Sequence, residues 1–454
     1  MATSAFDKRA LHLQKRAALI QAIRQWGEHS HETMTLLKST SNLFRHRQSH
    51  ARRIDVRAFN EVLWIDPQNE TAEVEGMTTY ETLVSETLRY GYLPAVVPEL
   101  KTITVGGALA GVGIESSSFR YGLVHETILQ FDVVLADGAV QTCRPDNEHR
   151  DLFYAFPNSY GTLGYAIKIT VKLIPCKKYI QLTYQHFTNA EDFFKRIEQL
   201  CLNNNTTAPL AYVDAVIFAD NHQVIITGEW ADDVPKVSNY RFMHIYYQAI
   251  KTKTHDYLTT EDYIWRWDSD WFWCSKVFHL QNPILRCLIG KWMLKSKVYS
   301  WLMRLSERNK IIRWWVNLGP KKESVIQDVA IPIHRALDYL RFFQNTINIL
   351  PIWICPVRPA SERPFDLFRM TPGTLYINFG FWDSVASEHE EGYYNRLIEK
   401  KVAELGGNKS LYSNVFYTEE EFWKIYDKPL YKALKQKYDP QNKLNTIDKK
   451  CTEK

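Results

Sequence analysis

The segment Thr104–Ser118 constrains the fold of this chain most strongly, because four of its residues within eight positions are glycine. Glycine adopts positive φ values readily and lets a backbone approach a ligand closely. Successive backbone N–H groups in such turns form a concave site for an anion such as pyrophosphate. The spacing matches neither Gly-x-Gly-x-x-Gly nor a P-loop, which ends in Gly-Lys-Ser/Thr. Taken alone, the segment is consistent with a phosphate site or with a structural turn.

A second glycine cluster follows at Gly161-Thr162-Leu163-Gly164. It lies between a predicted helix, Asp151–Phe156, and a predicted strand, Gly164–Leu173. We expect this cluster to bring a second stretch of backbone close to a cofactor. A tight turn without a ligand is the alternative interpretation.

Hydrophobic periodicity elsewhere predicts an α+β fold with short connections. In the first half it predicts a β-hairpin over Asn60–Gly76 and a helix over Thr79–Tyr90 that ends at Gly91. We place a domain boundary near Cys176, which gives domains 1–176 and 177–454. Further predicted elements are the amphipathic helix Leu11–Trp26, the strands Ile128–Leu135, Val213–Ala219, Gln223–Glu229 and Thr374–Phe381, and the helix Glu419–Lys437.

Composition narrows the class of protein. A net charge of +5 over 454 residues is too small to indicate nucleic-acid binding, and no nucleic-acid-binding motif is present. The seven cysteines are widely spaced without a Cys-x-x-Cys motif, which predicts neither a disulfide framework nor a metal site. We therefore expect an intracellular protein, cytoplasmic or peripherally membrane-associated. The sequence shows no signal peptide and no apolar run long enough to span a bilayer.

The run from Val97 to Pro175 resembles the PCMH-type FAD-binding domain of the vanillyl-alcohol-oxidase superfamily. More specifically, short motifs along nearly the whole chain resemble the delta(24)-sterol reductase family (24-dehydrocholesterol reductase, Diminuto/Dwarf). These motifs are Pro98-Glu99-Leu100, Thr104-Val105-Gly106-Gly107, 113–118, Tyr121-Gly122-Leu123, 134–138, 151–155, 161–164, Asn282-Pro283-Ile284, 350–356 and 420–423.

The resemblance implies a PCMH-type FAD-binding domain followed by a mixed α/β substrate (cap) domain, whose C-terminal segment returns to the flavin domain. It also implies reduction of the C24–C25 double bond of a sterol side chain by NADPH through non-covalent FAD. Eukaryotic members carry an N-terminal membrane anchor, whereas we expect this chain to begin at or just before the flavin domain. The residues expected to contact FAD are Thr104, Val105, Gly106, Gly107, Ala108, Leu109, Ala110, Gly111, Val112, Gly113, Ile114, Glu115, Ser116, Ser117, Ser118, Gly161, Thr162, Leu163 and Gly164.

An isolated alkene is a poor hydride acceptor, so this reaction needs a proton donor. Tyr412 is one candidate, because the C-terminal part of the superfamily's chain commonly returns to the flavin; the alternative is a buried structural tyrosine. Glu115 is a second candidate, with a cofactor contact or a loop-stabilising hydrogen bond as the alternative. A further group of basic residues is expected to be solvated or to bind phosphates of FAD or NADPH: Arg45, His46, Arg47, His50, Arg52 and Arg53.

The region 264–322 is rich in tryptophan and in basic residues. Between Ile284 and Lys322 there are ten Lys or Arg residues and one acidic residue, Glu307. Tryptophan prefers the headgroup level of bilayers, and basic residues are attracted to anionic lipids. Peripheral membrane contact and internal packing around a sterol pocket are the two interpretations. They apply above all to Trp265, Trp267, Trp271 and Trp273.

Two other functions remain open. The chain can be a flavin oxidoreductase of the same fold that acts on a sugar lactone or a lipid-linked sugar. It can also be a non-catalytic protein that binds a sterol or a flavin.

Overall fold

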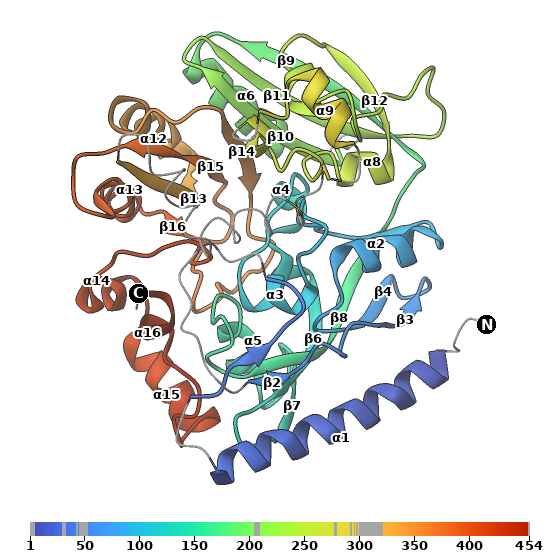
Figure 1. Ribbon diagram of the computed structural model, residues 1–454, viewed down its shortest axis with the longest axis vertical. Coiled ribbons are helices and arrows are strands. Elements are labelled where there is room, and N and C mark those ends of the chain that lie inside the picture. The colour runs from blue at the N-terminus through green and yellow to red at the C-terminus, as the bar shows by residue number, and fades with distance from the viewer. Residues whose placement is uncertain are drawn as a thin grey trace.

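The computed structural model describes residues 5–29, 33–41, 44, 53–203, 209–276, 279–290, 293, 294, 296, 298 and 321–452. The chain folds around two large antiparallel sheets, one in each half of the molecule (Figure 1). The sequence passes from the first to the second sheet between Pro175 and Tyr179. We retain the division into 1–176 and 177–454 as a proposal that fits this crossing.

The first sheet holds the strands in the order β3-β4-β8-β6-β7, and β5 pairs with the end of β8. The alternating buried side chains of β8 place one face of the sheet against the core. As predicted, β3 and β4 form a hairpin, and α2 follows with Thr79 as its N-cap. The strands are β3 (Val62–Asp66), β4 (Thr71–Glu75), β5 (Tyr92–Pro94), β6 (Ile128–Val134), β7 (Val140–Cys143) and β8 (Tyr165–Pro175).

The second sheet has eight strands in the order β12-β9-β11-β10-β14-β15-β13-β16. Apolar side chains of α6, α12 and α13 pack on one face of this sheet. Its strands are β9 (Tyr179–Phe187), β10 (Tyr212–Ala219), β11 (His222–Ala231), β12 (His255–Thr259), β13 (Lys322–Pro332), β14 (Ile352–Val357), β15 (Tyr376–Ala386) and β16 (Asn408–Lys409). The three helices are α6 (Ala190–Leu202), α12 (Ile333–Thr346) and α13 (Tyr393–Glu404).

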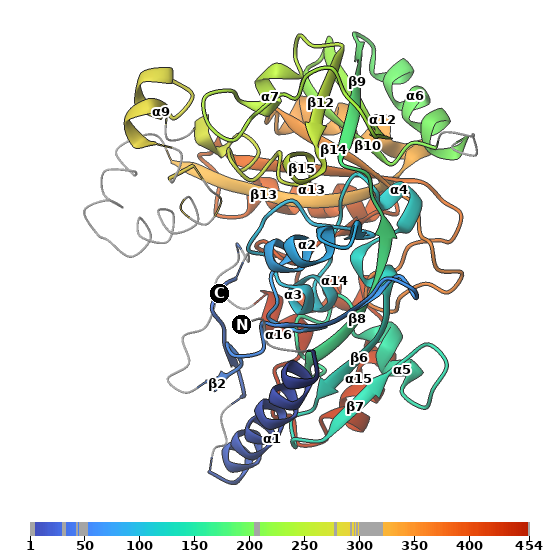
Figure 2. The same cartoon turned by 90° about the vertical axis from the view of Figure 1, so that its right-hand side faces the viewer.

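The other described elements connect or cover these sheets (Figure 2). They are α1 (Ala5–His29), β1 (Leu36–Leu37), β2 (Ile54–Asp55), α2 (Tyr80–Leu88), α3 (Val105–Ala110), α4 (Ser118–Tyr121), η1 (Val124–Thr127), α5 (Arg150–Ala155), α7 (Tyr246–Ala249), α8 (Thr260–Ile264), η2 (Cys274–Lys276), α9 (Pro283–Ile289), α14 (Glu419–Ile425), α15 (Lys428–Tyr438) and α16 (Ile447–Thr452). Within the described ranges, none of these helices is both long and apolar enough to cross a bilayer.

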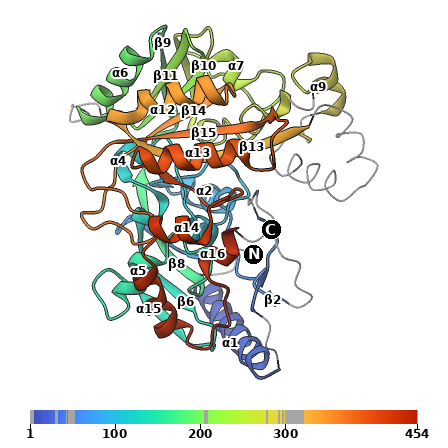
Figure 3. The same cartoon turned by 90° about the vertical axis from the view of Figure 1, so that its left-hand side faces the viewer.

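The C-terminal helices lie beside the first half of the molecule (Figure 3). On α15, the Lys437 ammonium lies 2.7 Å from an Asp151 carboxylate oxygen, and the Tyr438 hydroxyl donates to the same carboxylate. The prediction of a single helix over Glu419–Lys437 is wrong in one respect, because the segment forms two helices, α14 and α15. Asp427 caps the second helix, and Pro429 in its first turn lacks the N–H that a continuous helix needs.

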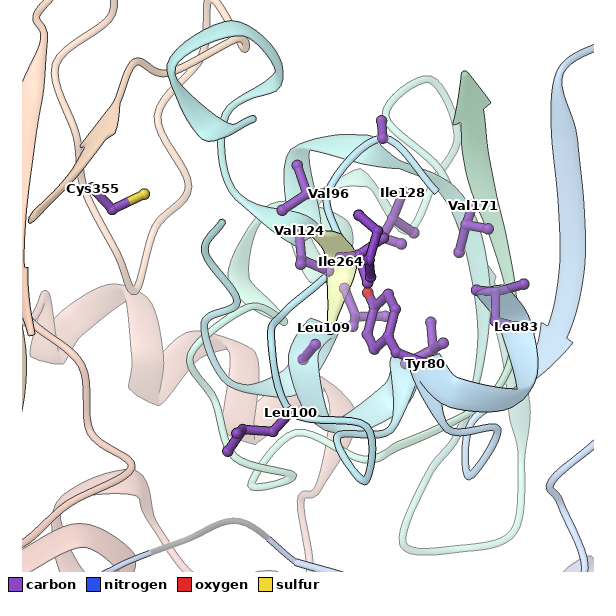
Figure 4. Close-up of a cluster of buried hydrophobic side chains, with 14 of the residues drawn as sticks. Tyr80, Leu83, Val96, Leu100, Leu109, Val124, Ile128, Val171, Ile264 and Cys355 are labelled. Carbon is purple, nitrogen blue, oxygen red and sulfur yellow. The ribbon is translucent and has the colours of Figure 1, made fainter. Parts of the chain in front are cut away.

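The glycine-rich segment is also more regular than a series of turns. Val105–Ala110 forms the short helix α3, and only the residues after it, up to Ser117, form an open loop. The Thr104 hydroxyl accepts a hydrogen bond from the Gly107 N–H at 3.1 Å and so caps the helix. Figure 4 shows Leu109 in a buried cluster with Tyr80, Ile128 and Val171. This packing fixes the apolar side of α3 and leaves Gly107 exposed.

Candidate functional site

A cavity of about 390 Å³ lies between the two halves of the molecule. The glycine-rich segment forms part of its wall, together with the second glycine cluster. The facing wall comes from the second half and combines aromatic side chains with the polar residues Asp328, Tyr412, Asn445, Lys449 and Lys450. A concave site whose lining is mostly apolar is typical of a cofactor or small-molecule pocket.

Close backbone contact brings α3 to the cavity. The Gly106 N–H donates to the Gly76 carbonyl at 2.9 Å, and a Cβ on Gly106 would lie 2.6 Å from that oxygen. No side chain larger than hydrogen fits there without moving one backbone away from the other. Gly106 therefore holds the glycine-rich helix against the turn between β4 and α2.

The loop after α3 fits an anionic or polar cofactor. Within the described part of the chain, the N–H groups of Val112, Gly113 and Ile114 donate to no protein atom, and all three residues line the cavity. Consecutive N–H groups of this kind form a nest for phosphate or carbonyl oxygens. The observation supports the pyrophosphate or the polar ring edge of FAD as the ligand of this wall.

Tyr412 forms a polar corner in the opposite wall. Its hydroxyl donates to Oδ2 of Asp328 at 2.7 Å and accepts from Nε1 of Trp382 at 3.1 Å. Asn378 donates to the other Asp328 oxygen at 2.7 Å. Burial raises the pKa of Asp328 to about 6, although both hydrogen bonds oppose this shift. Burial and the neighbouring carboxylate raise the pKa of Tyr412 well above its usual value.

Glu115 lies elsewhere, in a buried ionic cluster that joins the two halves. Its carboxylate accepts from Arg266 at 2.8 Å and from the Ser116 hydroxyl at 2.7 Å. Arg266 also donates to Asp214 of β10 at 2.9 Å. Glu115 does not line the cavity, whereas Glu99 does. Burial, followed by the charge of Glu115, raises the pKa of Glu99 well above its usual range.

Sequence comparisons show which proteins this chain is similar to. A model of the FAD binding domain matches residues 9–144. Delta(24)-sterol reductases from Macaca fascicularis and Homo sapiens are each 28% identical to this chain over 97% of its length and 86% of theirs. The delta(24)-sterol reductase of Pisum sativum is 27% identical over 88% of this chain and 76% of its own length. The chain is a homologue of the delta(24)-sterol reductases.

This delta(24)-sterol reductase homologue has the α+β fold with an FAD-binding domain that the resemblance implied. The structure brings together eleven of the residues predicted to contact FAD, because they line the cavity. They are Thr104, Gly106, Gly107, Ala108, Ala110, Gly111, Val112, Gly113, Ile114, Gly161 and Gly164. Their contact with FAD remains a proposal.

The other residues predicted to contact FAD do not line the cavity. Three of them, Val105, Leu109 and Leu163, are buried in the hydrophobic core of the homologue. The remaining ones are buried polar residues of the same two segments: Glu115, Ser116, Ser117, Ser118 and Thr162. Ser116 and Ser117 instead form hydrogen bonds with Tyr263 and with the Ala95 carbonyl.

Burial contradicts one of the two interpretations of the four tryptophans, namely that they contact a membrane. Trp265, Trp267, Trp271 and Trp273 are all at most 7% exposed, so they cannot form a membrane surface. Internal packing was the better interpretation, and Trp271 lines the cavity. Packing inside the protein removes the large apolar area of each tryptophan from water.

Several predicted residues lie outside the described part of the chain, namely Arg45, His46, Arg47, His50, Arg52 and Glu307. Arg53 is described and lines the cavity. Sequence reasoning missed Asp328, Trp382 and Glu99 as site residues of this homologue. The motif Pro98-Glu99-Leu100 was a signal for Glu99, whereas nothing in the pattern of β13, which also contains Glu323, singles out Asp328.

Proposed function

We propose that this protein reduces the C24–C25 double bond of a sterol side chain, with NADPH as the reductant and non-covalent FAD as the cofactor. One observation carries the proposal: a single cavity has a glycine-rich wall with free N–H groups on one side and the Tyr412 corner on the other. The names of its relatives support the choice of a sterol.

The loop after α3 would hold FAD through the N–H groups of Val112, Gly113 and Ile114, which need an acceptor. Gly107, which is exposed and lines the cavity, would let the cofactor approach the helix closely. When bound, FAD supplies the hydride-transfer chemistry between NADPH and the alkene. The protein positions both partners and excludes water.

Tyr412 would supply the proton. Reduction adds a hydride to one alkene carbon and a proton to the other, so the O–H bond of the donor breaks as a C–H bond forms. Tyr412 lines the cavity, and the N–H of Trp382 donates to its hydroxyl oxygen at 3.1 Å. That hydrogen bond stabilises the phenolate that remains after proton transfer.

The aromatic wall suits an apolar substrate. Trp271, Phe272, Trp353 and Trp382 line the cavity, and Phe272 stacks on Trp382 with ring centroids 4.2 Å apart. Flat aromatic faces exclude water and contact an apolar skeleton over a large area. They would hold the sterol side chain between the glycine-rich wall and Tyr412.

We also propose that the protein collects its substrate at a membrane through α9. Ile284 and Leu288 are 70% and 77% exposed and lie one helical turn apart, so they form one apolar face. Arg286 anchors the helix from its other side through two hydrogen bonds to Asp270, at 2.7 and 2.9 Å. The basic sequence between 284 and 322 would favour anionic lipid.

A two-step spectroscopic experiment tests the proposed reaction. FAD-loaded protein is reduced by NADPH without oxygen, which bleaches the visible flavin band, and desmosterol is then added. We expect rapid return of the band with desmosterol and no return with cholesterol, whose side chain is already saturated. A band that stays bleached after desmosterol would overturn the sterol reductase proposal and leave other alkenes, sugar lactones or lipid-linked sugars as substrates.

A further inference from the structure

We propose that Asp328 is the proton reservoir of the site: in its neutral form it passes a proton to the Tyr412 phenol as that phenol protonates the substrate. Asp328 is thus a positioning and relay residue that acts through Tyr412. The inference rests on the proposed function and adds to it the source of the proton.

The fold holds Asp328 in place from three sides. It lies on β13, where Asn378 of the neighbouring strand β15 donates to Oδ1 at 2.7 Å. Gly380, directly opposite in the same strand pair, leaves room for the carboxyl group, because a Cβ there would lie 2.7 Å from Oδ1. The backbone carbonyl of Asp328 accepts from the Ser410 N–H at 3.0 Å, close to Tyr412 in the chain.

Hydrogen-bond geometry shows why the protonation state of Asp328 matters. An ionised carboxylate only accepts hydrogen bonds, so it holds the Tyr412 proton at Oδ2, 2.7 Å away. Trp382 already donates to the phenol oxygen. A neutral Asp328 instead donates its own O–H to that oxygen, and the phenol proton is then free to point into the cavity.

Electrostatics also favour proton transfer from Tyr412 while Asp328 is neutral. If Tyr412 gave up its proton beside an ionised Asp328, two negative charges would face each other in a buried corner, which is costly. With neutral Asp328, one O–H bond of the carboxyl group breaks, the phenol regains a proton, and a single negative charge remains. Water restores the proton between turnovers, so no further reactant is needed.

The surrounding groups leave Asp328 able to titrate near neutral pH. Its hydrogen-bond partners, Asn378 and Tyr412, are neutral, and burial raises its pKa to about 6. The closest basic side chain on a paired strand, Lys409 of β16, forms a buried ion pair with Glu399 of α13. Tyr160 is the other titratable group that influences Tyr412.

The test compares the pH dependence of turnover in the FAD-loaded enzyme with NADPH and desmosterol. In the wild-type enzyme, kcat should fall as the pH rises through about 6. D328N should lower kcat by about 100-fold and remove this dependence, because an amide cannot relay a proton. D366N is the matched control, since Asp366 is a partly buried aspartate that does not line the cavity, and it should keep the wild-type profile.

A second variant shifts the titration without removing either relay group. The Asn378 hydrogen bond lowers the pKa of Asp328, so N378A should move the falling limb of kcat to higher pH. An infrared titration of the substrate-free protein adds a readout that does not depend on activity. The C=O band of a protonated carboxyl group should disappear through about pH 6 in the wild-type protein and be absent from D328N.

The outcomes separate the relay from the proposed function. The relay alone would be overturned if the wild-type enzyme turned over desmosterol and D328N kept the same pH dependence of kcat. It would also be overturned if N378A did not shift the pH at which kcat falls. Absence of desmosterol turnover in the wild-type protein would overturn the proposed function, and the relay to that substrate with it. An infrared band that titrates near pH 6 equally in wild type and D328N would show that another carboxyl group is the reservoir.

Discussion

The Gly106 N–H donates to the Gly76 carbonyl at 2.9 Å, which joins the glycine-rich helix α3 to the turn before α2. A Cβ at position 106 would lie 2.6 Å from that oxygen. We therefore expect G106A to lower the free energy of unfolding by about 1–3 kcal/mol, the usual cost of overpacking. Urea denaturation measures the loss. Stability equal to that of the wild-type protein would show that the two backbones separate easily.

Gly107 has a different role, because it is exposed and lines the cavity. We expect G107D to abolish FAD retention, since a carboxylate there would meet the phosphates of the cofactor. The measurement is the flavin content of protein purified after loading with FAD. Q68E adds the same charge on the exposed turn between β3 and β4, so it should retain FAD. Normal flavin content in G107D would refute the proposed cofactor site.

Tyr412 should matter for turnover but not for cofactor binding. We expect Y412F to lower kcat by about 100-fold while it retains FAD, because the ring remains and only the proton is lost. Phe44, which packs edge-on against Tyr412 with ring centroids 5.9 Å apart, should still contact the phenylalanine ring. The check is steady-state turnover of desmosterol beside flavin content. An unchanged kcat would remove Tyr412 from the mechanism.

Asp328 should make stability depend on pH. Its pKa in the folded protein is about 6, above the usual value of 3.8, so the folded state binds the proton more tightly than the unfolded state. Its contribution to stability is therefore present at low pH and is lost as the pH rises through about 6. Relative to wild type, the free energy of unfolding of D328N should rise by about 2–3 kcal/mol between about pH 4 and pH 7. Paired denaturation curves at the two pH values would show no such gain if Asp328 were solvated.

Helix α9 should bind lipid through its exposed face. We expect I284E with L288E to abolish binding to vesicles that contain anionic lipid, since each glutamate removes apolar contact and adds repulsion. L202E is the control, because Leu202 is also an exposed apolar residue, 42% accessible, and lies on α6 on the opposite side of the second half from α9 (Figure 2). Vesicle co-sedimentation measures the effect. Equal loss of binding in L202E would argue against a specific lipid-binding face.

Local sequence patterns predicted much of the fold, because hairpin turns, caps and alternating apolar residues act over a few positions. The hairpin around Asp66 and the helix capped by Thr79 are examples. The site was harder to predict. Tyr412 and Asp328 are 84 residues apart in sequence, and only the pairing of β13, β15 and β16 brings their side chains together. Glu115 was predicted as a candidate proton donor, with a cofactor contact or a loop-stabilising hydrogen bond as the alternative, and in the structure Arg266 and Ser116 hold it in the core.

The most direct test of the central claim is the chemical fate of desmosterol. FAD-loaded protein, reduced with NADPH without oxygen, is incubated with desmosterol, and the extracted sterol is analysed by mass spectrometry. We predict a product heavier by two hydrogens, with the mass of cholesterol. Desmosterol recovered unchanged from protein whose flavin NADPH has reduced would contradict the proposed function.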